Sequence, residues 1–204
     1  DNNNVSLESQ ADVDSFPSQY CSTLCGLTIM GNDITNLDSL YVLEKVGRLV
    51  IQMNPVLTNI NGLSNVTSIE GECDNSGITI SGNNQLADLN GLSSLTRIDG
   101  TLTIQSNTML TDLTGLSNLR EADALGIYDN ASLQNIDGLD GLARLGGGLT
   151  ISGNPGLQNI DGLSHVTFVD GGLAIGFNDA LVNLNGLASV TTVEFGVTNS
   201  NTPD

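Results

Sequence analysis

LTISGNPGLQNIDGLSHVTFVDGG, beginning at Leu149, is followed at Leu173 by LAIGFNDALVNLNGLASVTTVEFG, and this pair of segments decides the fold. The two segments start 24 residues apart, at 149 and 173, and most of their apolar positions coincide. Further copies begin at Leu125, Leu102, Ile78, Leu49 and Leu27, with a fragment at Val197. A fixed period of this length is typical of repeat proteins, in which each unit packs on its neighbours.

The apolar positions of the repeat predict one strand and several turns per copy. The third position is Ile and the fifteenth is Leu in every full copy: Ile29, Ile51, Ile80, Ile104, Ile127, Ile151 and Ile175, and Leu40, Leu63, Leu92, Leu116, Leu139, Leu163 and Leu187. The alternation L-T-I is typical of a strand, whereas the later spacing of three favours turns and 3₁₀ segments. We therefore predict a mainly β fold, a right-handed parallel β-solenoid of about eight coils of roughly 24 residues each.

Asn and Gly recur at fixed positions, which we interpret as architecture. Asn at the sixth position is expected to form a ladder of amide hydrogen bonds between coils, and Gly at the fourteenth to occupy a turn with positive φ. The residues are Asn32, Asn54, Asn83, Asn107, Asn130, Asn154 and Asn178, and Gly62, Gly91, Gly115, Gly138, Gly162 and Gly186, with Ser39 as the exception.

The repeat resembles a known family. The string L-x-x-L-x-x-I-x-G-x-L-x-I-x-x-N-x-x-L is similar to the repeat of the receptor L domain, a leucine-rich-repeat relative of extracellular surface proteins, and C-G-L-T-I at Cys25 to Ile29 is similar to its start. The resemblance covers about residues 21–200 and implies binding of proteins, peptides or glycans without catalysis. It divides the chain into an N-terminal polar segment with a Cys-containing cap, 1–26, and a solenoid, 27–204, with a Cys-bearing insertion at 70–77.

Composition restricts the environment and the partners. The net charge of −18, from 23 acidic and 5 basic residues, disfavours nucleic acid and anionic membranes. No apolar run approaches the roughly 18 residues of a membrane span. Cys21, Cys25 and Cys73 favour a disulfide near the N-terminal cap, with the pairing left open. We expect a secreted or cell-surface protein that is a monomer or part of a larger surface protein.

Chemistry-bearing motifs are scarce. His165 is the only imidazole, and no nucleotide-binding or metal-ligand spacing occurs, so the sequence predicts neither an enzyme nor a cofactor. Asp88 and Asp112 share the eleventh position and Asp137 and Asp161 the thirteenth, as weak Ca²⁺ candidates. A further acidic column, at the twenty-second position, contains Glu70, Asp99, Asp123, Asp170 and Glu194. Screening by water, or pairing with Lys45, Arg97, Arg120 and Arg144 just before that column, explains the carboxylates better than Ca²⁺ binding does, because two carboxylates are too few for a tight site.

The outward positions of the predicted strands carry small, uncharged residues in a chain that is otherwise acidic. We predict a protein- or glycan-binding surface there, with Tyr128, Phe177, Gln105, Met53 and Asp129 as its contact residues. A structural stalk is one alternative. Ice binding is another, through Thr28, Thr79, Thr103, Thr150 and Thr198 and a second column of Thr67, Thr96, Thr167 and Thr191, although β-branched residues also simply suit strands.

Overall fold

The protein is mainly β, with one large sheet in which all strands are parallel. The computed structural model describes residues 3–16, 22–70, 76–194 and 196–199. The sheet contains 13 strands in this described part of the chain. They are β1 (Asn4–Leu7), β2 (Thr23–Ile29), β3 (Lys45–Gln52), β4 (Ser68–Ile69), β5 (Gly77–Ser81), β6 (Arg97–Gln105), β7 (Glu121–Tyr128), β8 (Arg144–Leu145), β9 (Leu149–Ser152), β10 (Phe168–Val169), β11 (Leu173–Gly176), β12 (Thr192–Val193) and β13 (Val197–Asn199).

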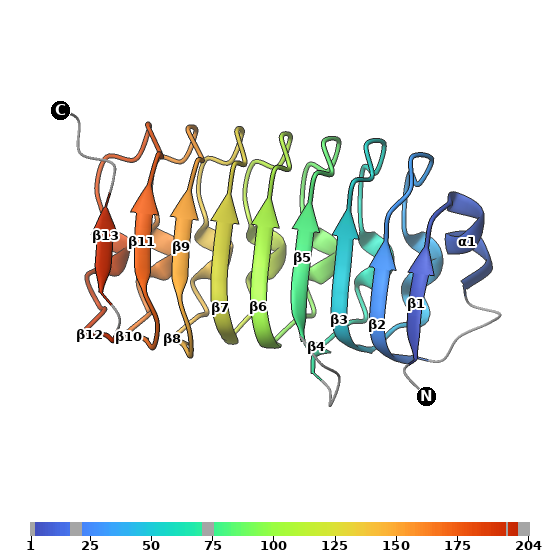
Figure 1. The fold of residues 1–204 in the computed structure, drawn as a ribbon, viewed down its shortest axis with the longest axis horizontal. Helices are drawn as coiled ribbons and strands as arrows, with labels where there is room; N and C mark the ends of the chain where they lie inside the picture. Colours follow the sequence, from blue (N-terminus) through green and yellow to red (C-terminus); the bar gives the residue numbers. More distant parts are fainter. Residues whose placement is uncertain (1–2, 17–21, 71–75, 195, 200–204) are drawn as a thin grey trace.

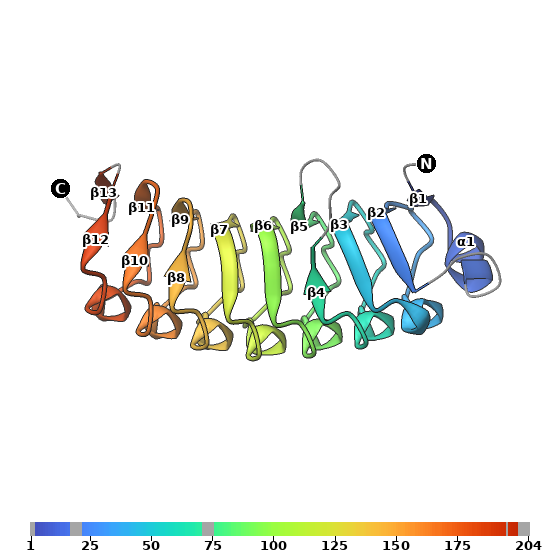
Figure 2. The same ribbon diagram turned by 90° about the horizontal axis from the view of Figure 1, so that it is seen from below.

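From η2 onward, each repeat has one 3₁₀ turn on the side opposite its long strand. The helical segments are α1 (Gln10–Ser15), η2 (Asp38–Val42), η3 (Asn61–Leu63), η4 (Asn90–Leu92), η5 (Thr114–Leu116), η6 (Asp137–Leu139), η7 (Asp161–Leu163) and η8 (Asn185–Leu187). The long strands stand side by side in Figure 1, with the 3₁₀ turns behind them. In Figure 2 these turns form a row below the strands, so each repeat encloses a narrow interior between the two.

The repeats pair in register at the predicted apolar positions. Consecutive strands align Ile29, Ile51, Ile80, Ile104, Ile127, Ile151 and Ile175 in one continuous row. These side chains are buried, as are the fifteenth-position leucines up to Leu163, whereas Leu187 is only partly buried. The apolar columns of the sequence therefore form one elongated core. Because a single repeat has little interior of its own, contacts between repeats must supply most of the stabilisation.

The N-terminal segment is more structured than the predicted polar cap. β1 pairs with β2, with Val5 opposite Leu27, and so adds another strand to the sheet. α1 begins with a capping box between Ser9 and Asp12 and buries Val13, and Phe16 just beyond it is also buried. β2 starts before the predicted boundary at residue 27. Cys21, Cys73 and most of the predicted insertion, at 71–75, lie outside the described residues.

Glycine occurs at the fourteenth position for a different physical reason from the one predicted. Their φ angles are not positive. A Cβ at any of them would instead clash with a backbone carbonyl of the preceding repeat, as Gly138 would with Leu113. Ser39 departs from the pattern in the first full copy, where α1 rather than a 3₁₀ turn packs against η2. Close approach between neighbouring backbones therefore explains this column, and the positive-φ prediction was wrong.

Candidate functional site

From β2 onward, the strand face carries no charged side chain at its second and fourth positions in the described residues, whereas the exposed Glu8 stands beside Met30 at the end of β1. The second-position row consists of Thr28, Val50, Thr79, Thr103, Gly126, Thr150, Ala174 and Thr198. Val50, Gly126 and Ala174 interrupt it, so at most two threonines are adjacent, Thr79 and Thr103. In the second threonine column, the hydroxyls of Thr96, Thr167 and Thr191 donate to backbone carbonyls of the preceding repeat.

Tyr128 lies flat on this face instead of protruding from it. Its side chain is half-buried, and a Cβ at Gly126 would clash with the ring. The ring therefore occupies the space that Gly126 leaves open two residues earlier on β7. Gln105 is paired directly beside it on β6. Gln105 and Tyr128 form the part of the predicted contact set that belongs to the strand face.

Met53, Asp129 and Phe177 lie on a different surface, the turns that follow the strands, which we call the turn edge. The residues of these turns with positive φ are Met53, Gly82, Ser106, Asp129, Gly153 and Phe177. Met53 and Phe177 are 64% and 68% exposed, with φ of 54° and 55°. Phe177 follows β11 and is two strands from Tyr128, whereas Met53 follows β3, three strands from Tyr128 on the opposite side. The predicted contact set is therefore divided between two surfaces.

A ladder of asparagines lies beneath the turn edge and fixes its backbone. Asn107 donates from Nδ2 to the Ile80 carbonyl at 2.9 Å and accepts at Oδ1 from the Asn83 backbone N–H at 3.1 Å. The same pattern recurs at the buried asparagines Asn54, Asn83, Asn130 and Asn154. This confirms the predicted ladder, but Asn32 is exposed, and Gly31 takes its place by donating to Asn54 Oδ1. The first copy is one residue shorter here.

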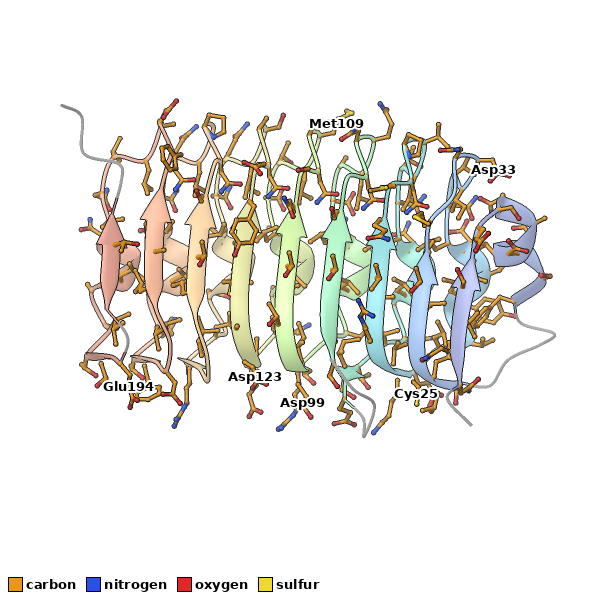
Figure 3. The ribbon with its side chains drawn as sticks, viewed as in Figure 1. Cys25, Asp33, Asp99, Met109, Asp123 and Glu194 are labelled. Carbon is orange, nitrogen blue, oxygen red and sulfur yellow. The ribbon has the colours of Figure 1, made fainter. Side chains whose placement is uncertain are left out.

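Oppositely charged side chains meet at the other end of the strands, which we call the charged edge. Lys45 Nζ lies 2.6 Å from Glu70, and Arg97 contacts Asp99 at 2.6 Å and Glu121 at 2.7 Å. The hydrogen bond from the Lys45 ammonium lowers the pKa of Glu70, and that same bond raises the pKa of Lys45. Asp99, Asp123 and Glu194 of the acidic column lie along this edge in Figure 3. Part of the column is therefore paired.

The Ca²⁺ candidates have structural roles or stand apart. Asp88 and Asp112 accept hydrogen bonds from backbone N–H groups two residues later, as asparagines do at the same position of other repeats. The Thr114 hydroxyl bond is the main cause of the lowered pKa of Asp112. Asp137 and Asp161 begin η6 and η7 and are exposed. In the described part of the chain, no three His, Cys, Asp or Glu side chains converge as a metal site would require.

Among the described residues, no helix has the length and apolar character needed to cross a membrane. Neither protein-family models nor curated proteins give a match to the sequence.

Proposed function

We propose that the chain is a non-catalytic extracellular recognition or adhesion module that binds a protein or glycan partner through the strand face and the adjoining turn edge. Within this proposal the fold is a right-handed β-solenoid of the leucine-rich-repeat, receptor L-domain-like kind. The described parallel sheet, with its strand–3₁₀ repeat, supports the proposal. The sequence resemblance supports it as well.

The observation that carries the proposal is the conformation of Phe177. A bulky residue with positive φ is strained, whereas Gly82 and Gly153 occupy the same turn without that cost. Its ring is nevertheless 68% exposed, so burial in the core does not explain why the residue is there. An exposed aromatic group held in a strained turn, two strands from Tyr128, has the properties expected of an interface anchor.

One feature supports an extracellular location. Cys25 takes part in a disulfide, and disulfides persist in oxidising compartments.

The test compares Tyr128→Ser/Phe177→Gly with the wild-type chain on glycan arrays and on extracts of surface proteins. Glycine suits the φ of residue 177, so the double variant should keep its melting temperature and lose affinity by about tenfold or more for any specific partner. Val182→Ser is the matched control, since Val182 is 80% exposed and lies outside the strands. Equal binding by the double variant and the wild type would exclude this surface.

Ice binding is the alternative that the threonine row supports. Parallel strands repeat the row about every 4.8 Å, a spacing that could order surface water. The runs of adjacent hydroxyls are short, however, and the second column already donates its hydroxyls to carbonyls. Thermal hysteresis with faceted ice crystals, lost in Thr79→Val/Thr103→Val, would establish ice binding, and unfaceted discs would exclude it.

A further inference from the structure

One repeat, which we call the trimmed repeat, has smaller side chains than its neighbours at the charged edge. Gly141, Ala143 and Gly146 stand where neighbouring repeats have larger side chains, and all three fall within the same turn of the chain. The corresponding residues in the flanking repeats are Asn118, Arg120 and Asp123 on one side and His165, Thr167 and Asp170 on the other. Because three neighbouring columns of side chains are reduced in the same repeat, the surface is irregular at this point.

A hollow of about 430 Å³ lies beside Ala143 and Gly146, between β6, β7 and β8, whereas the Arg120 guanidinium occupies the space that Gly141 leaves open. Its lining includes the exposed Ala143 and the side chains of Arg97, Arg120 and Arg144, while Ile98 and Ala122 beneath it are buried in the core. Asp99 and Asp123, which border the hollow, lie at the lower ends of the strands in Figure 3, whereas Met109 lies at the opposite edge. A cavity of this size accommodates a ligand of about one sugar ring.

Basic side chains are concentrated here in a chain that has only 5 of them. Arg97 is already paired with Asp99 and Glu121. Arg120 instead donates to the carbonyls of Ser117 and Leu119 at 3.0 and 3.3 Å, and the Arg144 guanidinium lies 4.2 Å from the centre of the Phe168 ring.

In the described residues neither Arg120 nor Arg144 forms an ion pair with a carboxylate. Their positive charges are therefore not neutralised by a carboxylate of the described residues and can attract an anion.

The mixed charge of the rim decides which anion fits. A guanidinium binds a planar carboxylate through two parallel hydrogen bonds. Asp123 and Glu121, close by, would repel a dianion such as phosphate more strongly than a monoanion, yet they can accept hydrogen bonds from hydroxyl groups. The exposed methyl group of Ala143 offers apolar surface to the C–H face of a ring. Carboxylate, hydroxyls and a C–H face occur together in a sugar acid.

We propose that this hollow is a binding site for a sugar acid of the hexuronate type, with Arg120 and Arg144 holding its carboxylate. The site lies at the beginning of β6 and β7, whereas Gln105 and Tyr128 lie at the ends of those strands, so it does not depend on the strand-face proposal.

Calorimetric titration of the whole chain with glucuronate, glucose, acetate and inorganic phosphate tests the proposal. We expect glucuronate to bind more tightly than the other three compounds, since only it offers both the carboxylate and the ring. Arg120→Gln and Arg144→Gln should each weaken glucuronate binding by about tenfold or more, because each removes a charge-assisted hydrogen bond. Equal affinity for phosphate or acetate would overturn the assignment to a sugar acid.

Gly146→Asp is the sharpest variant. A Cβ at Gly146 meets only Asp123, at an ordinary distance of 3.5 Å, and the neighbouring repeats already carry Asp at this position, so the variant should fold. Its carboxylate would compete for the two arginines and abolish glucuronate binding, while Arg48→Gln, outside the hollow, should leave binding unchanged. Retained binding in a folded Gly146→Asp protein would contradict the proposal.

Discussion

The two edges of the sheet connect neighbouring repeats by opposite means. At the turn edge, neutral amides of buried asparagines join one repeat to the next without interruption from Asn54 to Asn178. At the charged edge, exposed ion pairs join only some neighbours, through Lys45 and Arg97. A buried hydrogen bond is costly to leave unmade, whereas an exposed ion pair contributes little.

The difference indicates where the molecule tolerates variation. Every ladder asparagine holds the backbone of the preceding repeat, so its identity is fixed by the fold. The side chains around the ladder are not fixed in this way, and the same turn carries Met53, Gly82 or Phe177. Likewise the charged edge accepts the trimmed repeat with its hollow. Both proposed binding surfaces lie where the regular architecture leaves the residue type open.

The largest effect should come from the middle of the ladder. Asn107→Ala leaves the Asn83 backbone N–H and the Ile80 carbonyl without the partners they have now. Each buried group left unpaired costs about 1–3 kcal/mol, so we expect the free energy of unfolding to fall by about 3–5 kcal/mol. Urea denaturation followed by circular dichroism measures the change.

Asn118→Ala is the matched control for this prediction. The exposed Asn118 side chain also bonds the preceding repeat, through the Ser93 carbonyl at 2.8 Å, but water can replace it there. Its loss should cost less than about 1 kcal/mol. If both variants lost the same free energy of unfolding, the buried ladder would contribute no more to stability than an exposed hydrogen bond.

The 3₁₀ side of the repeats should be the next most sensitive region. A Cβ in Gly138→Ala would clash with the Leu113 carbonyl and force neighbouring backbones apart, at a cost of about 2–3 kcal/mol. Gly172→Ala is the control, since no atom lies within 4 Å of its Cβ position. It should change stability by less than about 1 kcal/mol, in either direction. Thermal melting measures both variants, and equal melting temperatures would contradict close approach as the reason for glycine in this column.

The sequence predicted the interior better than the surface. The repeat places Ile104 and Leu116 in the core because periodicity records which side chains are buried. The close approach at Gly138 could not be predicted, because the sequence does not show whether a glycine is required by limited space or by a positive φ. The strand β1 could not be predicted either, because its short sequence contains no full copy of the repeat. The hollow was missed since Gly141, Ala143 and Gly146 look like ordinary gaps until the three arginines are placed around them.

The smallest effect should come from the charged edge, and pH should reveal it. The pKa of Glu70 is lowered by Lys45, so its contribution is present above the pKa of an unfolded Glu and is lost as pH falls through the folded pKa. The pKa of Lys45 is raised by Glu70, so its contribution is present below the pKa of an unfolded Lys and is lost as pH rises through the folded pKa. Both contributions are therefore present near neutral pH.

Glu70→Gln should therefore lower the melting temperature at neutral pH by much less than Asn107→Ala does. The side chains of Lys45 and Glu70 are 51% and 34% exposed, so about 1 M NaCl should reduce the difference from the wild type, since it shortens the screening length to about 3 Å. Acid should erase it, once Glu70 is protonated in the folded protein. Glu194→Gln removes a carboxylate of the same column that has no ion pair among the described residues, and it should show neither response. A loss in Glu70→Gln as large as that of the ladder variant, and unchanged by salt, would mean that the two edges stabilise the repeats equally.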